Sequence, residues 1–379
     1  MVLLYVYILL IILNLIKRDS KVLFFSLIIF MWILVGWSEG TADWHIYVAR
    51  FENYEEVSSR TEVVFTLIMR IGHFLNFDYR MMYVVLTAVC FLLIGSTIYA
   101  YSKAPGFVIA IYAIFTFPID ATQLRFFTAF SVAVFAYRFI FNYYCTKKKK
   151  EIIKWLLAML VAVNIHMSVL VFTVVLIPLF FSRKTTIIFT IVSNALMVFF
   201  SSTRSRVYEM IVSLLGSEKA DIVAEQRAQY GMGTIIFVWI KILIIFLGFV
   251  LFYVFIKYFT QRNHLHELGN CLSDGKYQII NYEKCLDFNI AILSIMGLIM
   301  VTSDFYRIQQ IVMMLNYMIY ASYLTPSKKQ TLVVNNLVIV ILSVSFAFIA
   351  LYNLVLNSMN YNTVFLPLFQ NNQLLNNIL

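Results

Sequence analysis

The sequence predicts an all-α polytopic membrane protein with about 12 transmembrane helices, and three observations support this. Hydrophobic residues make up 62% of the 379 positions and charged residues 13%, whereas a soluble domain has roughly 25% charged residues. Apolar segments recur along the whole chain with short polar breaks, and clusters of basic residues fall in several of these breaks. A chain this apolar cannot cover itself with polar surface, so we expect the bilayer to be its solvent.

The apolar segments predict the positions of the helices. We expect them near residues 2–16, 22–37, 81–101, 107–119, 124–144, 152–166, 167–181, 185–200, 235–257, 287–302, 307–324 and 331–353. Several are shorter than the roughly 20 residues of a perpendicular span, and the 152–181 stretch allows a different division. Basic residues follow the first apolar run and do not precede it, so we interpret this run as a membrane helix and not as a signal peptide.

The basic clusters predict how the helices are oriented. Cytoplasmic loops carry an excess of Lys and Arg, and placing the first cluster in the cytoplasm returns every later lysine cluster to that side. We therefore expect one transmembrane domain over 1–353 in a bacterial cytoplasmic (inner) membrane. It would have outward loops at 38–61 and 201–234, an outward turn near 303–306, a cytoplasmic loop at 258–286 and an outward Asn-rich tail at 354–379. No basic, aromatic-laced soluble face is evident, which argues against nucleic-acid binding.

The segment 62–77 differs from the other apolar runs. It is apolar on one side but carries Glu62, Arg70 and His73. It is too short and too polar for an ordinary span, so we predict an interfacial or re-entrant helix, placed beside protein or a wet cavity.

On the predicted topology, the basic residues on the outward side are mostly arginines, whereas those on the cytoplasmic side are mainly lysines. On the predicted topology the outward arginines are Arg50, Arg60, Arg70, Arg80, Arg125, Arg204, Arg206, Arg227 and Arg307. Topology needs only positive charge, whereas a planar guanidinium grips a carboxylate or phosphate with two hydrogen bonds. An anionic, lipid-linked phosphate or pyrophosphate is therefore a candidate ligand. The alternative is that these arginines reach lipid headgroups or pair with nearby carboxylates.

Asp43, Tyr47 and Tyr54 recur at helical spacing after the second predicted span. A carboxylate framed by aromatic rings suits sugar binding or acid–base chemistry. The alternative is an aromatic belt at the membrane interface, with Asp43 as a helix N-cap.

Three further motifs lie at the outward ends of predicted helices. Asp120, Gln123 and Arg125 crowd a helix start, where an anion is also favoured by the helix itself. His166 and Ser168 end a helix, and Asp304, Tyr306 and Arg307 adjoin another. For each motif a structural role is the alternative, as a cap, a satisfied histidine or a local salt bridge. The four cysteines lack zinc-ligand spacing, and we expect neither a metal nor a cofactor.

In their order, these motifs resemble the EpsG family of exopolysaccharide and O-antigen polymerases, the Wzy type. In that family an Asp-x-x-x-Tyr stretch follows an early span, as Asp43 and Tyr47 do here. A Glu-containing amphipathic helix, an Arg at a helix start, a His-x-Ser and a later Arg-containing turn then follow. The matching positions are Glu62, Arg125, His166 with Ser168, and Arg307.

The resemblance spans roughly residues 40–320 and has two departures. The family often has Arg-Gln at the helix start, whereas here Gln123 precedes Arg125. Met167 stands between His166 and Ser168, where Pro is common.

The resemblance implies a glycosyltransferase that joins undecaprenyl-pyrophosphate-linked repeat units on the outer face of the membrane. Arg125 and Arg307 would bind pyrophosphate, and Asp43 or His166 would be the base. Tyr47, Glu62, Gln123, Asp304 and Tyr306 would contact substrate. A flippase and a chain-length regulator are expected partners. Two alternatives stay open: another polyprenyl-phosphate-dependent transferase or ligase, and a lipid-linked oligosaccharide flippase or transporter.

Overall fold

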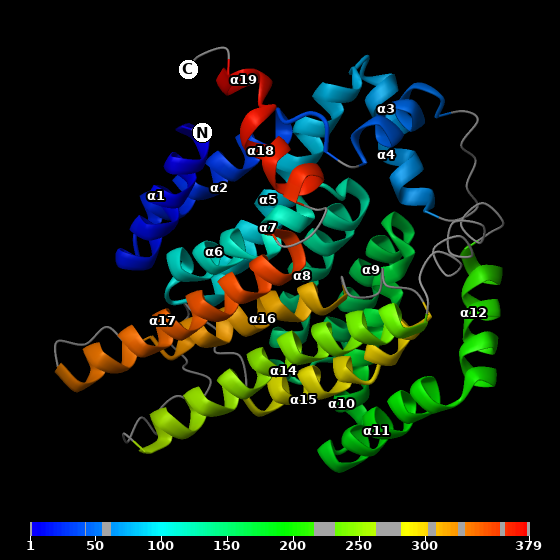
Figure 1. Cartoon of the computed structure of the whole chain (residues 1–379), viewed down its shortest axis with the longest axis vertical. Coiled ribbons are helices and arrows are strands. Elements are labelled where there is room, and N and C mark those ends of the chain that lie inside the picture. Colours follow the sequence, from blue (N-terminus) through cyan, green and yellow to red (C-terminus); the bar gives the residue numbers. More distant parts are fainter. Residues whose placement is uncertain are drawn as a thin grey trace.

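The computed structural model describes residues 2–41, 43–54, 62–215, 232–262, 282–301, 308–324, 330–356 and 361–376. Within these ranges the regular secondary structure is helical, joined by short turns, and an isolated bridge links Ser38 and Asn372. Figure 1 shows the helices as one bundle whose first and last segments lie beside each other. The predicted all-α fold is confirmed for the described part of the chain.

The first half of the chain supplies twelve helical segments up to the long break after residue 215. They are α1 (Val2–Ile16), α2 (Lys21–Gly36), α3 (Trp44–Glu52), α4 (Val63–Phe74), α5 (Tyr79–Tyr101), α6 (Pro105–Ile114), α7 (Thr116–Asp120), α8 (Leu124–Thr146), α9 (Lys149–Ile165), η1 with α10 (Met167–Leu176, Ile177–Phe180), α11 (Arg183–Phe199) and α12 (Ser201–Leu215). The first half of the predicted outward loop 201–234 is therefore a helix.

The second half contributes longer helices and a compact tail. They are α14 (Met232–Arg262), α15 (Tyr282–Leu293), η3 (Met296–Met300), α16 (Ile308–Ser322), α17 (Gln330–Leu351), η5 (Tyr352–Leu356), η6 (Tyr361–Phe365), α18 (Leu366–Gln370) and α19 (Gln373–Asn376). The tail segments α18 and α19 lie beside the N-terminal helices (Figure 1).

Fewer helices of the described chain are long enough to cross a bilayer than the twelve spans that we expected. Four stretches of the described chain are long and apolar enough to cross a bilayer: 79–101, 124–146, 239–256 and 336–356. A fifth exists if α11 and α12, which meet at an angle of 101°, form one broken span. Shorter apolar helices occupy most of the other predicted positions. The structure thus supports a multi-pass membrane protein without confirming the count of twelve.

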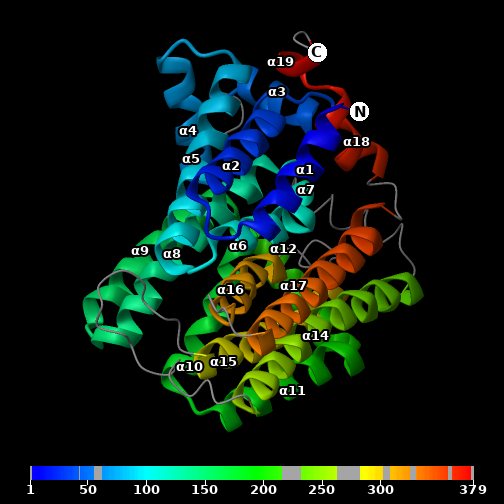
Figure 2. The same ribbon diagram turned by 90° about the vertical axis from the view of Figure 1, so that its left-hand side faces the viewer.

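Two helices form the centre of the bundle. Residues 105–113 of α6 and 310–321 of α16 are buried throughout. The α6 helix is apolar on every side, as expected of a buried helix, whereas α16 also buries Gln310 and Asn316, and the Asn316 amide pairs with that of Asn289. The hydroxyl groups of Thr116 and Tyr317 join the two regions at 3.0 Å. In Figure 2, α16 lies directly below α6, and the two helices pack against each other.

The two ends of the first nine helices differ in their basic residues. At one end, Gly106 N donates to Arg18 O at 2.8 Å and Tyr101 Oη to Asn142 at 3.2 Å. These contacts gather residues 17–21, 102–106 and 146–150, which we call the lysine end. At the other end, Arg80 contacts Gly36 O and Tyr83 contacts Ala121 O. This second group, residues 36–54, 62–83, 115–126 and 165–168, is the arginine end. The predicted orientation of these two ends across the membrane stays a prediction.

The helix α4 has the amphipathic character expected for the 62–77 segment. It buries Phe65 and Met69 and exposes Leu67, Ile71 and Phe74. Its 12 residues are too few for a span. It packs closely on α3 at Gly72, where an added Cβ would lie 3.1 Å from Phe51. The His73 ring stacks between Phe51 and Tyr54, with centroids 4.1 Å from each, and its Nε2–H donates to Phe51 O at 2.6 Å. The two short helices form one unit.

We expect the arginine end to face outward and the lysine end to face the cytoplasm, because the basic loops gather at the latter. An alkaline phosphatase fusion after Asn76 should be active and one after Lys150 inactive, with β-galactosidase fusions giving the reverse. The opposite pattern would place the candidate site on the cytoplasmic side.

Candidate functional site

Arg125 is the centre of the arginine end. It lies in the first turn of α8, where its Nη1 donates to Glu62 Oε2 at 2.5 Å and its Nε donates to Tyr47 Oη at 3.3 Å. The guanidinium also lies 5.6 Å from the centre of the Tyr47 ring. Three of the predicted site residues, separated by up to 78 positions, therefore meet at one point.

Glu62 has an unusual backbone conformation. It precedes α4 with φ +70° and ψ +38°, the left-handed region that favours glycine and asparagine. Such a conformation costs of order 1–3 kcal/mol and persists where surrounding contacts hold it. Here the carboxylate is held by Arg125, and the backbone carbonyl accepts from Thr66 N at 3.1 Å. We infer that the site requires the acidic side chain at this strained position.

The Glu62–Arg125 ion pair is largely withdrawn from solvent. The side chains are 6% and 16% exposed. Removing both charges from water has a large cost, which their attraction repays only in good geometry. The pair neutralises Arg125, so an anionic ligand reaching this arginine must compete with the Glu62 carboxylate. Arg125 can thus bind an anion only if that anion takes the place of the Glu62 carboxylate.

Asp43 lies close to a group of aromatic side chains on α5. It directly precedes Trp44, which contacts two tyrosine rings of that helix. Trp44 packs edge-on against Tyr79 at 4.9 Å and Tyr83 at 5.4 Å. Asp43 occupies the N-cap position of α3 without making a side-chain cap hydrogen bond. The predicted ring of Tyr54 lies beyond the end of α3 and stacks on His73 instead, so the aromatic group near Asp43 is not the predicted one.

Sequence reasoning missed Tyr79 and Tyr83 as part of this setting. The sequence does contain a pattern that indicates them. Tyr79 and Tyr83 are four residues apart, directly after Asp78 and close to the start of the span predicted at 81–101, so they lie on the same face of that helix. Asp78 caps α5 by accepting from Met81 N at 2.7 Å. This cap fixes where α5 begins and hence which rings face Asp43.

Two of the outward arginines have structural roles. Arg80 Nη1 donates to the carbonyls of Gly36 and Ser38 at 3.0 and 2.9 Å, its Nη2 pairs with Glu39, and it lies 4.3 Å from the Trp44 ring. Arg204 Nη1 donates to two carbonyls at the end of α11 at 3.1 and 2.7 Å. Both satisfy carbonyl groups at helix ends, which a lysine point charge does less well.

His166 contacts the site through Phe126, the neighbour of Arg125. Its ring packs edge-on against Phe126 at 5.7 Å. The backbone N of Ser168 donates to His166 Nδ1 at 3.3 Å, and Ser168 Oγ lies 2.7 Å from the same nitrogen. A backbone N–H can only donate, so Nδ1 is the acceptor and the neutral ring carries its proton on Nε2. In this tautomer the Nε2–H of His166 is a hydrogen-bond donor.

The turn before α8 carries two buried acceptor oxygens. Asp120 is fully buried and accepts from Tyr112 Oη at 3.0 Å. Its second oxygen and Gln123 Oε1 have no hydrogen-bond partner among the described residues. Gln123, two residues before Arg125, thus has its amide oxygen buried inside the protein. Asp304, Tyr306 and Arg307 lie outside the described residues, as do Arg60 and Arg227.

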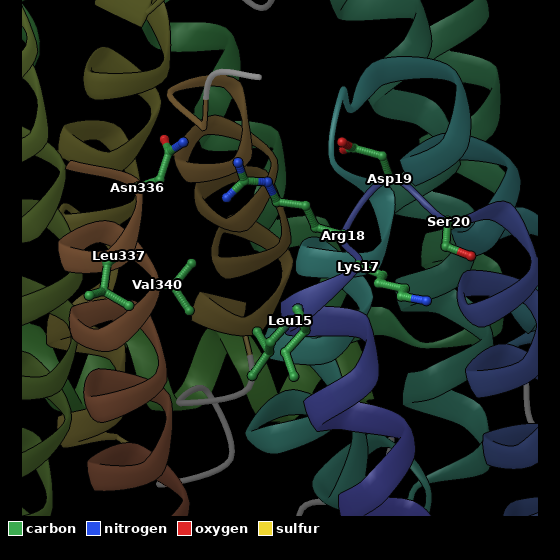
Figure 3. A pocket seen from close by; sticks show the side chains of 9 residues that line it. Leu15, Lys17, Arg18, Asp19, Ser20, Asn336, Leu337 and Val340 are labelled. Carbon is green, nitrogen blue, oxygen red and sulfur yellow. The ribbon is translucent and has the colours of Figure 1, made fainter. Parts of the chain in front are cut away.

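No group of three His, Cys, Asp or Glu side chains positioned to hold a metal ion occurs in the described ranges. Two cavities of similar size lie at opposite ends of the bundle. One, of about 550 Å³, adjoins Trp44 and His45 at the arginine end. The other, of about 540 Å³, lies between the α1–α2 turn and α17 at the lysine end, where Arg18 extends toward Asn336 (Figure 3).

The buried ion pair predicts a defined pattern of stability. Arg125→Gln should destabilise the protein by about 3–5 kcal/mol, because it leaves the Glu62 charge buried without its partner. Glu62→Gln combined with Arg125→Gln should be more stable than Arg125→Gln alone. Thermal unfolding of the purified variants in one detergent measures this. Additive losses in the double variant would show that the pair contributes no coupling.

Comparison with known proteins identifies the family of the chain. The family model of the EpsG family matches residues 21–363, which include every described residue of the site. Searches of curated proteins and of solved structures find no significant match. The family implies a polysaccharide polymerase-like, multi-pass membrane protein. With a match over nine-tenths of its length, the chain belongs to the EpsG family.

Proposed function

We propose that this protein is a polysaccharide polymerase, a membrane glycosyltransferase that joins undecaprenyl-pyrophosphate-linked repeat units on the outer face of the bacterial cytoplasmic membrane. The observation that carries the proposal is the meeting of Tyr47, Glu62 and Arg125 at the arginine end. The guanidinium of Arg125, which is paired with Glu62, suits a pyrophosphate. Asp43, which lies beside aromatic rings, suits a sugar. The site therefore fits a substrate that contains both groups.

The proposed reaction transfers a saccharide chain from one lipid carrier to a sugar hydroxyl on another. The acceptor oxygen forms a bond to the anomeric carbon of the donor, and the bond between that carbon and the pyrophosphate oxygen breaks. The carrier pyrophosphate leaves with the bonding electrons, and the hydroxyl proton passes to a base. Arg125 exchanges Glu62 for the departing pyrophosphate, whose growing charge it stabilises.

Three carboxylate or imidazole groups are available as the base. The tautomer of His166 presents a donor, which suits holding a sugar hydroxyl or phosphate oxygen better than taking a proton. Asp43 stands at the start of α3 beside tyrosine rings and is the base we propose. Glu62, released when Arg125 binds pyrophosphate, would bind the acceptor. Tyr47 and Gln123 would position substrate, and Asp304, Tyr306 and Arg307 would complete the pyrophosphate site from the segment before α16.

A transporter or flippase fits the site less well. Such proteins place charges along the membrane depth, and the two cations deep in the described spans have local partners. Arg138 Nε donates to Thr97 at 3.1 Å, and Lys241 donates to the carbonyl of Asn353. Another polyprenyl-phosphate-dependent transferase would use the same groups. A flippase supplying the lipid-linked unit and a chain-length regulator are the partners the reaction would need.

Deleting the gene and sizing the surface polysaccharide on a gel tests the proposal. A polymerase deletion leaves single repeat units without a ladder of longer chains. Loss of all surface repeats would instead assign the protein to an earlier step or to lipid flipping.

Arg125→Lys keeps the positive charge but loses the planar guanidinium, which can donate two parallel hydrogen bonds to one anion. We expect polymer formation to fall by about 10²–10³-fold, the scale of removing a transition-state donor, with normal protein in the membrane. Arg70→Lys is the matched control, because Arg70 is exposed on α4 away from the pair, and should polymerise normally. We expect Arg307→Lys to behave like Arg125→Lys. Full activity of Arg125→Lys would reduce this residue to a structural charge.

Asp43→Asn keeps the size and hydrogen bonding of the side chain and removes its basicity. We expect a loss of roughly 10²–10⁴-fold, the scale of general base catalysis. His166→Gln preserves a neutral donor and should retain measurable activity. An assay of purified protein with lipid-linked repeat units measures both, and the reverse ranking would assign the proton transfer to His166.

A further inference from the structure

The cavity at the arginine end is built by the C-terminal tail. It lies between the segment that follows α2 and the short helices α18 and α19. Its volume of about 550 Å³ lies within the range of about 300–1,000 Å³ typical of small-ligand sites. The side chains that line it are Glu39, Trp44, His45, Gln370, Asn371 and Gln373.

Backbone and amide hydrogen bonds fix the tail against the end of α2. Glu39 N donates to Asn371 O at 3.2 Å, and Gln373 N donates to Trp37 O at 3.0 Å. Asn372 is fully buried, and its amide donates to Ile33 O at 2.9 Å. The far wall of the cavity is therefore held by contacts between residues more than 330 positions apart, and the cavity has a defined shape.

A backbone turn at Gly40 brings the two walls together. Gly40 has φ +70°, and an added Cβ would lie 3.1 Å from the Asn371 amide nitrogen. That amide donates to Glu39 O at 3.2 Å. A residue without a side chain is therefore required where the loop approaches the tail.

The lining favours a neutral, hydroxyl-rich ligand. Three primary amides offer both donors and acceptors, and the imidazole of His45 is exposed beside them. The nearest guanidinium, that of Arg80, is held by Glu39, two carbonyls and the Trp44 ring. The cavity thus offers alternating donors and acceptors with a carboxylate, which matches sugar hydroxyls and disfavours a pyrophosphate.

The cavity adjoins the proposed base. Trp44 and His45 directly follow Asp43 at the start of α3, and Trp44 packs against the Tyr79 and Tyr83 rings. Arg125, by contrast, is reached through Tyr47, one helical turn further along α3. The proposed base therefore adjoins the cavity, and the arginine site lies about one helical turn away along α3.

We propose that this cavity is the subsite for the acceptor saccharide, and that the C-terminal tail forms one of its walls. The inference rests on the proposed function and adds to it the place where the sugar end of the second substrate binds. The acceptor sugar lies between the tail and α3 and presents its hydroxyl to Asp43, while the donor pyrophosphate binds at Arg125.

The test uses the full-length protein in lipid nanodiscs and, as the probe, lipid-free oligosaccharides released from the strain's own surface polysaccharide. His45→Ala combined with Gln373→Ala removes two exposed lining side chains for which the structure gives no side-chain hydrogen bond to another described residue. We expect saccharide affinity to fall about tenfold, the scale of losing one or two neutral hydrogen bonds. The apparent KM for the acceptor should rise similarly, with kcat within twofold. Asn362→Ala, exposed on the same tail outside the cavity, is the matched control.

The outcomes separate this inference from the proposed function. Unchanged affinity and acceptor KM in the double variant would overturn the subsite, as would equal losses in Asn362→Ala. Neither result would affect the polymerase proposal, which the deletion strain tests separately: a full ladder of chain lengths, or loss of all surface repeats, would contradict that proposal. A raised donor KM with unchanged acceptor KM would assign the cavity to the donor instead and would also overturn the inference.

Discussion

The ion pair between Glu62 and Arg125 joins α4 to the start of α8, and the remaining features of the arginine end are arranged around it. Two charges so far withdrawn from water remain ionised because each is the other's partner. The same pairing gives Arg125 a partner in the absence of a ligand, so any anion that binds this arginine must take the place of Glu62. In the proposed function that anion is the carrier pyrophosphate.

Around the pair, the fold separates two kinds of recognition. Arg125 faces Tyr47 and Glu62, a setting for an anion, whereas the cavity beside Trp44 and His45 is lined mainly by amides. Asp43 lies at the start of α3, directly before the lining residue Trp44. The short helices α3 and α4 can hold this arrangement because His73 stacks between Phe51 and Tyr54 and fastens them to each other. Their apolar outer face, including Leu67 and Ile71, is suited to the membrane interface.

Much of this was predictable from the sequence, for identifiable physical reasons. Periodic apolar runs and lysine clusters predict the helices and the alternation of their ends, because burial and positive charge act locally along the chain. Arg125 could be selected as a candidate site residue because an arginine at the start of an apolar helix is unusual. That Glu62 is its partner could not be derived, since 63 positions separate them. Nor could the roles of Arg80 and the tail, because their contacts depend on how the end of α2 packs in three dimensions.

The central claim is that this site transfers saccharide from one pyrophosphate carrier to another, with Arg125 taking the leaving group. The most direct measurement incubates the purified protein in vesicles with lipid-linked repeat units as the sole sugar source and counts glycosidic bonds formed and carrier pyrophosphates released. The account predicts a ladder of chain lengths with one pyrophosphate released per bond. Single units that stay unjoined, or chain growth without release of carrier pyrophosphate, would contradict it.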